Sequence, residues 1–174
     1  MLLPSLSRSA FLLDHPSFLD RFDLHEIVSN PENLQFFFPA TQTQYETDFL
    51  LVHYFMKEPL GVWAIVDRES NKLIGIVRFE KIDVQKRTAE LGYFLNALYW
   101  GRGIMTETVT CLSDLALTAM GMERIILIAH LENKASIRVA EKSGFKLVSR
   151  FKGADRYTRT MRDYLRFEKE KNCE

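Results

Sequence analysis

A glycine-rich turn lies between an apolar segment and an amphipathic one, and it constrains the fold more than any other feature of the chain. The apolar segment, residues 89–95, predicts a buried strand, and a helix is predicted directly after Gly101-Arg102-Gly103. At such a junction backbone N–H groups converge at the positive end of a helix dipole, and glycine lets an anion approach the chain closely. The junction therefore predicts a phosphate site, although the glycine pair alone is also compatible with a simple turn.

The segments beyond this turn follow the pattern of a crossover between parallel strands. From residue 104 to residue 119 apolar side chains recur three and four positions apart, which predicts an amphipathic helix with a broad buried face. Residues 125–129 form a continuous apolar run that is typical of a strand covered on both faces. A strand, a helix and a second strand predict a right-handed crossover, and therefore two parallel strands.

The last part of the chain contains a second helix signal. Asn133 is predicted to cap a helix over residues 134–143, and Gly144 is predicted to take the left-handed conformation that ends it. Residues 145–151 and 157–167 are the last predicted strands.

The first half of the chain predicts two helices placed between strands. A helical stripe of Phe18, Phe22 and Ile27 ends near Pro31, and a second helix is predicted over residues 43–56. The predicted strands of this half are residues 10–13, 62–66, 73–79 and 87–95. This order predicts an α+β fold, with a mixed central sheet flanked by helices, in a single domain over residues 1–174.

Composition excludes several classes of function. Lys and Arg together number 23, and so do Asp and Glu, so the charge balance gives no general affinity for nucleic acid. Cys111 and Cys173 fit neither a disulfide framework nor a metal motif, and the histidines add no ligand spacing, so no metal is expected. We read neither a signal peptide nor an apolar run of membrane length, which favours a soluble, cytoplasmic protein without a membrane partner.

Three segments of the chain resemble the GNAT acetyltransferase superfamily and, within it, the branch of ribosomal-protein N-terminal (Rim-type) acetyltransferases. They are residues 89–94 ahead of the turn, residues 99–107 around it and residues 133–145 after the second strand. Trp100 and Met105 stand where the superfamily loop usually has Gln or Arg and Gly or Ala. The N-terminal segment hardly matches the family pattern, so the resemblance does not identify the acceptor.

The resemblance implies that acetyl-CoA binds as the cosubstrate. In the family the pyrophosphate binds at the glycine turn, and the pantetheine arm lies in a gap where the two parallel strands splay apart. The residues implied as cofactor-binding are Phe94, Leu95, Trp100, Gly101, Arg102, Gly103, Ile104, Met105, Thr106 and Asn133. For the turn glycines the alternative is a turn without a ligand, and for Asn133 it is a helix cap.

Acyl transfer to an amine needs a proton acceptor for the amine and benefits from a proton donor for the departing thiolate. Glu90 lies on the strand that leads into the turn, where several family members place a catalytic glutamate, so it is the candidate general base. Ser136 aligns with the residue proposed as the acid in Rim-type enzymes. The alternatives are a cross-strand ion pair for Glu90 and assistance to the helix cap for Ser136.

These inferences predict an acetyl-CoA-dependent N-acetyltransferase in which a primary amine attacks the thioester directly. The acceptor is expected to be a protein N-terminus, with a ribosomal protein as one candidate, or a small amine. A homodimer is compatible with the resemblance. The alternative from another class is a non-catalytic acyl-CoA-binding or regulatory module of the same fold, in which Glu90 and Ser136 are only structural.

Overall fold

The computed structural model describes residues 9–155 and 157–171 of the 174-residue chain. The chain divides into two compact units. The first contains the chain up to Arg78 together with Tyr93–Ile104, and the second contains Phe79–Gly92 and the chain from Met105 onward. The single domain expected over residues 1–174 stays a prediction. Cys173 lies outside the described residues.

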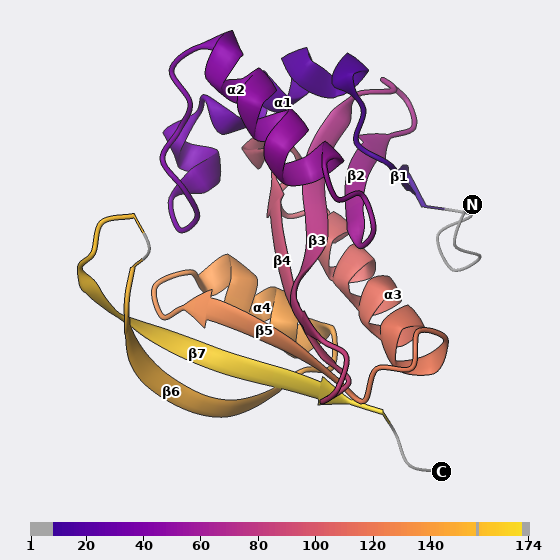
Figure 1. The fold of residues 1–174 in the computed structure, drawn as a ribbon, viewed down its shortest axis with the longest axis vertical. Helices are drawn as coiled ribbons and strands as arrows, with labels where there is room; N and C mark the ends of the chain where they lie inside the picture. Colours follow the sequence, from indigo (N-terminus) through magenta and orange to yellow (C-terminus); the bar gives the residue numbers. More distant parts are fainter. Residues whose placement is uncertain (1–8, 156, 172–174) are drawn as a thin grey trace. The chain divides into compact units, whose positions relative to one another are not determined.

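The strands belong to one mixed sheet, drawn as arrows in Figure 1. In the described residues they are β1 (Phe11–Asp14), β2 (Val62–Asp67), β3 (Leu73–Asp83), β4 (Thr88–Leu95), β5 (Arg124–His130), β6 (Lys146–Ala154) and β7 (Met161–Glu170). Their hydrogen-bonded order is β1-β2-β3-β4-β5-β7-β6. β4 and β5 are parallel, whereas the pairs β1–β2, β2–β3, β5–β7 and β6–β7 are antiparallel. The predicted α+β class and the predicted parallel pair are confirmed.

In the described residues of the first unit five short helical segments precede β2, and three of them begin with a side-chain cap, at Ser17, Asn30 and Thr43. They are a 3₁₀ turn (Phe18–Asp20), α1 (Arg21–Val28), a second 3₁₀ turn (Pro31–Leu34), α2 (Gln44–Leu50) and a π-helical turn (Leu51–Met56). Thr43 and Glu46 form a reciprocal capping box at the start of α2, which satisfies two backbone N–H groups that the helix itself cannot. The helix predicted over residues 43–56 is therefore confirmed, with a π-helical last part.

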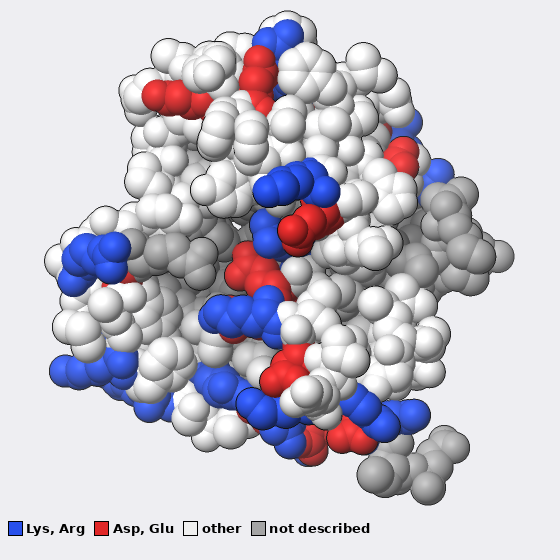
Figure 2. Space-filling view, in the orientation of Figure 1, with Lys and Arg blue, Asp and Glu red and all other residues white. Residues whose placement is uncertain are grey.

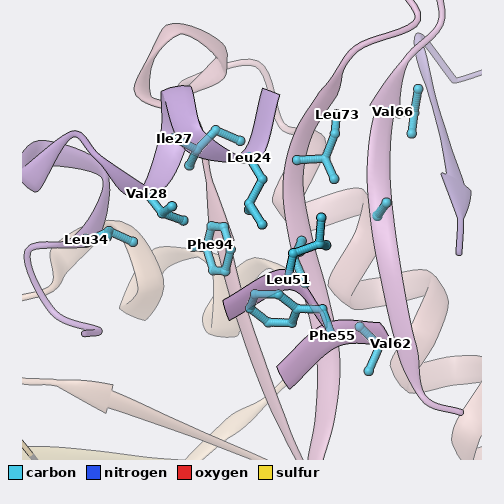
Figure 3. Close-up of a cluster of buried hydrophobic side chains, with 12 residues drawn as sticks. Leu24, Ile27, Val28, Leu34, Leu51, Phe55, Val62, Val66, Leu73 and Phe94 are labelled. Carbon is cyan, nitrogen blue, oxygen red and sulfur yellow. The ribbon is translucent and has the colours of Figure 1, made fainter. Parts of the chain in front are cut away.

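The apolar core of the first unit is built from α1, the second 3₁₀ turn and the π-helical turn, together with β2, β3 and β4. Figure 3 shows Phe94 among side chains from α1 and from the π-helical turn. The rings of Phe37, Phe38 and Phe55 lie 5.9–6.3 Å from the Phe94 ring, centroid to centroid, a spacing at which edge-on aromatic contacts are favourable. The buried members of this core are Leu24, Ile27, Val28, Leu34, Leu51, Phe55, Val62, Ala64, Val66, Leu73, Ile76 and Phe94.

The helical stripe predicted for the first helix was partly wrong. Ile27 is fully buried as expected, but Phe18 and Phe22 are exposed, Phe22 with 66% of its surface. The buried residues of α1 are instead Leu24, Ile27 and Val28. The guanidinium carbon of Arg21 lies 4.8 Å and 5.0 Å from the centroids of the Phe18 and Phe22 rings, so both exposed rings make a cation–π contact with this side chain.

The second unit contains the parallel pair and the end of the chain. Within its described residues, the parallel pairing joins Thr88–Glu90 to Arg124–Ile126 and stops after Glu90. Its helices are α3 (Ile104–Thr118, of which Ile104 belongs to the first unit) and α4 (Lys134–Lys142). Lys169 on β7 donates to Ser113 Oγ on α3 at 3.1 Å and pairs with Asp114 at 2.6 Å, so α3 lies against β7.

The strands at the chain end differ in detail from their prediction. The two faces of β5 are not equally covered, because its residues alternate between buried and half-buried. The last strand begins at Met161 rather than at Tyr157, since Asp155 accepts from the backbone N–H groups of Tyr157 and Thr158 and forms a turn there. None of the helices in the described part of the chain combines the length and apolarity needed to cross a membrane.

Candidate active site

The glycine turn joins the end of β4 to the start of α3 through a short 3₁₀ helix, Ala97–Tyr99. Gly101 and Gly103 have φ angles of +74° and +79°, a left-handed conformation that favours glycine. A Cβ atom added at either position would meet no other atom within 4 Å. The space beside the turn is therefore open, as an anion that approaches the backbone requires.

Two side chains tie this turn to the end of β4. The Trp100 indole donates its Nε1–H to the Leu95 carbonyl oxygen at 2.9 Å. The Arg102 guanidinium donates to the Leu98 carbonyl oxygen at 3.0 Å, and its carbon lies 4.9 Å from the centroid of the Tyr99 ring. Trp100, which departs from the usual superfamily residue, thus has a structural role that holds the turn against the strand.

The first turn of α3 leaves its backbone N–H groups without partners inside the helix, as at every helix start. Met105, the second departure from the superfamily loop, is buried along with Ile104. Ser143 Oγ, just after α4, donates to the Thr106 carbonyl oxygen at 3.2 Å. The first turn of α3 is thereby fixed to the end of α4, within the second unit.

Asn133 caps α4 as the sequence predicts. Its side-chain oxygen accepts from the Ser136 backbone N–H at 3.0 Å, and Gly144 after the helix has a φ of +83°. Ser136 itself is only 9% exposed, in the first turn of α4. The cap is confirmed, whereas ligand contacts of Asn133 and Ser136 stay predictions.

Glu90 takes part in a cross-strand ion pair, which is the predicted alternative to its role as a general base. Its Oε2 atom lies 2.9 Å from Lys81 Nζ on β3, and its side chain is 18% exposed. A second carboxylate, which was not predicted from the sequence, lies beside β4. It belongs to Glu80 on β3, whose Oε1 atom would be 3.2 Å from a Cβ atom at Gly92. The signal that was present is Gly92 itself, since a glycine inside a strand often marks a close approach.

The rings of His130, Phe151 and Tyr164 form a packed group in the second unit. Strand register places Tyr164 opposite both His130 and Phe151, with ring centroids 5.5 Å and 5.6 Å from the tyrosine ring. His130 Nδ1 accepts from the Glu132 backbone N–H at 3.1 Å. Burial raises the pKa of Tyr164. These contacts give the His130 and Tyr164 side chains packing roles.

The basic side chains of the last two strands lie at the surface of the second unit. Figure 2 shows Lys and Arg gathered at the lower left, where β6 and β7 lie in Figure 1. Several of them are paired within the unit: Arg150 with Asp163 at 3.3 Å, and Arg166 with Glu168 at 2.7 Å. This pattern is that of a solvated charged face.

Comparison with known proteins identifies the family. The model of the acetyltransferase (GNAT) domain matches residues 11–146. The uncharacterized N-acetyltransferase YoaA of Bacillus subtilis is 25% identical over 149 residues, which cover 83% of this chain and 84% of YoaA. The ribosomal-protein-serine acetyltransferase of Escherichia coli is 29% identical over 87 residues, about half of each chain (50% and 49%).

Solved structures agree on the fold. The microcin C7 self-immunity acetyltransferase MccE, solved with acetyl-CoA and AMP, superposes with a TM-score of 0.85 at 21% identity and covers 97% of this chain and 98% of its own. That likeness shows the fold alone. The family match covers most of the chain and includes the glycine turn, α3 and α4, and on this ground the chain belongs to the GNAT acetyltransferase family, whose acyl donor is acetyl-CoA.

Proposed function

We propose that this protein transfers the acetyl group of acetyl-CoA to a primary amine by direct attack, without an acyl-enzyme. The observation that carries the proposal is the open turn at the start of α3. Two left-handed glycines there leave room beside the backbone, and the helix N-terminus supplies unpaired N–H groups and a partial positive charge. A pyrophosphate needs both features.

The same turn and its neighbours would hold acetyl-CoA. Its pyrophosphate would accept hydrogen bonds from the N–H groups of residues 102–106 and from the Thr106 hydroxyl. The pantetheine arm would bind along the backbone of Phe94 and Leu95, where the parallel pairing of β4 has already stopped. Because Trp100 occupies the Leu95 carbonyl oxygen, the arm would use the other backbone groups of this segment.

The protein's part in the chemistry is to move protons and to place the amine. At neutral pH a primary amine arrives protonated and must lose a proton before it can attack. A carboxylate on the face of β4 that bears Glu90 would accept that proton. Ser136, buried in the first turn of α4, would pass a proton to the departing thiolate. Acetyl-CoA supplies the thioester.

We propose a protein N-terminus as the acceptor class. The support is the half-length match to the Escherichia coli enzyme, which is named for ribosomal-protein serine acetylation. Short peptides with free α-amino groups, one set with the N-termini of ribosomal proteins and one with unrelated N-termini, would test this class against polyamines and amino sugars.

Calorimetric titration first tests whether the protein binds acetyl-CoA. The purified protein should bind acetyl-CoA and CoA with a Kd in the micromolar range, and ATP at the same concentration should give no heat. Release of free CoA thiol in the presence of each amine then tests the reaction. Binding without thiol release for any amine would favour a non-catalytic acyl-CoA-binding module, and no binding would refute the proposed cofactor site.

A further inference from the structure

The 3₁₀ helix that leads into the glycine turn, Ala97–Tyr99, is held by a residue far away in the sequence. The backbone N–H of Ala97, its first residue, donates to Asn33 Oδ1 at 2.7 Å across 64 positions of the chain. The next N–H, that of Leu98, donates to Asn96 Oδ1 at 3.1 Å. The first N–H groups of a helix have no partner inside it, so two side-chain oxygens supply what this helix lacks.

Asn33 lies in the second 3₁₀ turn, and its own side chain is fixed at both ends of the amide. While its oxygen accepts from Ala97, its nitrogen donates to the Ile27 carbonyl oxygen on α1 at 2.8 Å. Only 3% of Asn33 is exposed. A buried amide whose donor and acceptor are both bonded forms a rigid link, and here the link joins α1 to the segment before the glycine turn.

Hydrogen bonds carry this link from Ala97 into the turn. The Trp100 backbone N–H donates to the Ala97 carbonyl oxygen at 3.1 Å. The Arg102 guanidinium donates to the Leu98 carbonyl oxygen at 3.0 Å. The residues on either side of Gly101 are therefore bonded to the 3₁₀ helix, and the place of that helix sets the place of the turn.

All members of this link belong to one compact unit. Asn33, α1 and residues 93–104 are parts of the first unit, so Asn33 and the glycine turn have a defined arrangement. A second bond supports the same segment, because Asn96 Nδ2 donates to Glu26 Oε1 on α1 at 3.2 Å. The helices of the first unit thus hold the residues that precede the turn.

We propose that Asn33 is a positioning residue for acetyl-CoA binding. It holds the 3₁₀ helix, and thereby the glycine turn, in the conformation that receives the pyrophosphate, and it acts through the Ala97 N–H rather than by contact with the cosubstrate. A turn that is fixed before binding loses less freedom when the ligand arrives. The inference rests on the proposed function, since it concerns the cosubstrate site proposed at this turn.

The first test needs no ligand. The chain contains two tryptophans, Trp63 and Trp100, so in a Trp63→Phe variant the fluorescence reports on Trp100 alone. In this background Asn33→Ala should increase the quenching of Trp100 by acrylamide and shift its emission to longer wavelength, because the indole loses its fixed place beside Leu95. Unchanged quenching and emission would show that the turn keeps its conformation without Asn33, and would overturn the proposal.

The second test measures binding and turnover in the full-length protein. Asn33→Ala should raise the calorimetric Kd of acetyl-CoA by about tenfold or more, because only a fraction of the molecules then holds the turn in the competent conformation. With an amine that the wild type acetylates, KM for acetyl-CoA should rise likewise, while kcat at saturation stays within about twofold of wild type.

Thr47→Ala is the matched control. Thr47 is also fully buried in the first unit, and its Oγ1 lies 2.6 Å from His25 Nδ1 and 2.8 Å from Thr41 Oγ1. These partners lie outside residues 93–104, so the variant loses buried hydrogen bonds and stability without loosening the turn. Its Trp100 emission and its Kd for acetyl-CoA should match those of the wild type. Equal weakening of binding by Thr47→Ala would assign the loss to general destabilisation and overturn the proposal.

Ala97→Pro removes the same hydrogen bond from its other side, and keeps the test valid if Asn33→Ala fails to fold. Proline suits the first position of a helix, and Asn96 before it has φ −57° and ψ 130°, which a following proline allows. The variant should change the Trp100 emission and the Kd in the same direction as Asn33→Ala. The double variant should stay within about twofold of the weaker-binding single variant, since both changes remove one bond.

The outcomes separate this inference from the proposed function. A wild type that binds acetyl-CoA, with Asn33→Ala and Ala97→Pro variants that bind it equally well, overturns the role of Asn33 and leaves the cosubstrate site standing. A wild type that does not bind acetyl-CoA overturns both proposals, whatever Trp100 reports.

Discussion

The core of the first unit and the strand β6 of the second unit contain similar apolar residues in opposite environments. β2 lies between β1 and β3, and four of its six residues are buried, three of them in the apolar core of the first unit. β6 lies at the edge of the sheet, and Leu147, Val148 and Phe151 on it are exposed. The difference shows that an apolar sequence pattern predicts a strand, whereas the burial of that strand depends on which other elements pack against it.

The two units also differ in how their elements are held. In the first, side chains far apart in sequence meet in one apolar cluster. In the second, ion pairs join neighbouring strands and helices. Arg124 on β5 contacts Glu168 and Glu170 on β7, and Lys169 contacts Asp114 on α3. Because exposed ion pairs each contribute little, substitutions of these paired charges should cost less than substitutions of fully buried apolar residues in either unit, such as Leu51 and Leu112.

The largest effect on stability is expected for a leucine of the first core. Leu51→Ala should lower the free energy of unfolding by about 2–5 kcal/mol, because Leu51 is 0% exposed and its loss leaves a cavity. Leu147→Ala on β6, where the leucine is 58% exposed, should change it by no more than about 0.5 kcal/mol. Urea denaturation monitored by circular dichroism measures both. Equal losses would contradict the contrast drawn between the two regions.

The next effect concerns the glycine turn. Gly103→Val should weaken acetyl-CoA binding by about 100-fold or more, because a branched side chain in a left-handed position is strained and would fill the space beside the turn. Gly121→Val is the matched control, since Gly121 also has a φ of +74° and open space at its Cβ. It should cost similar stability and leave the calorimetric Kd unchanged. Unaltered binding by Gly103→Val would place the pyrophosphate elsewhere.

A smaller effect is expected at the start of α4. Asn133→Ala should cost about 1 kcal/mol of stability because it removes the cap on the Ser136 N–H. Asn133→Asp keeps a capping oxygen, so its thermal stability should stay near that of wild type. If Asn133 also contacts a phosphate, the aspartate should weaken acetyl-CoA binding by repulsion. An unchanged Kd for both variants would leave Asn133 as a cap alone.

The features that could be predicted from the sequence are those with local causes. Asn133 lies three residues before the N–H that it caps, and Gly101 and Gly103 directly precede α3. Such signals need no knowledge of the rest of the chain. The contact between Glu80 and Gly92 arises from the pairing of two strands and from one left-handed residue at Lys81. No periodicity encodes either. The one sequence signal is Gly92, because a glycine inside a strand marks a close approach, but it does not identify the residue that approaches.

The exposure of Phe18 and Phe22 was unpredictable for a related reason. Their spacing with Ile27 fits one helical face, but Arg21 lies over both rings and Asp48 on α2 holds Arg21 in place. The two rings thus contact a cation that a carboxylate from a distant segment positions, and neither contact follows from their spacing. The function of this aromatic surface cannot be derived from spacing either.

The smallest effect on stability is expected at the ion pair of Arg21 and Asp48. The hydrogen bond from Arg21, and secondarily that from Gln44, holds the pKa of Asp48 below its ordinary value, although desolvation opposes this. A carboxyl whose pKa is lowered in the folded state contributes stability above its unfolded pKa, and loses it as the pH falls through the folded value. Asp48→Asn should therefore lower stability slightly at pH 7 and flatten its decline below about pH 4.

Asp155 in the second unit allows the pH dependence of stability to be compared between the two units. Its pKa is also lowered, chiefly by hydrogen bonds from Thr158, but those bonds close a local turn, whereas Asp48 joins α1 to α2. Unfolding curves recorded between pH 2.5 and 7 should thus show a change in slope for Asp48→Asn and a smaller one for Asp155→Asn. A larger change for Asp155→Asn would mean that the turn before β7 unfolds together with its whole unit.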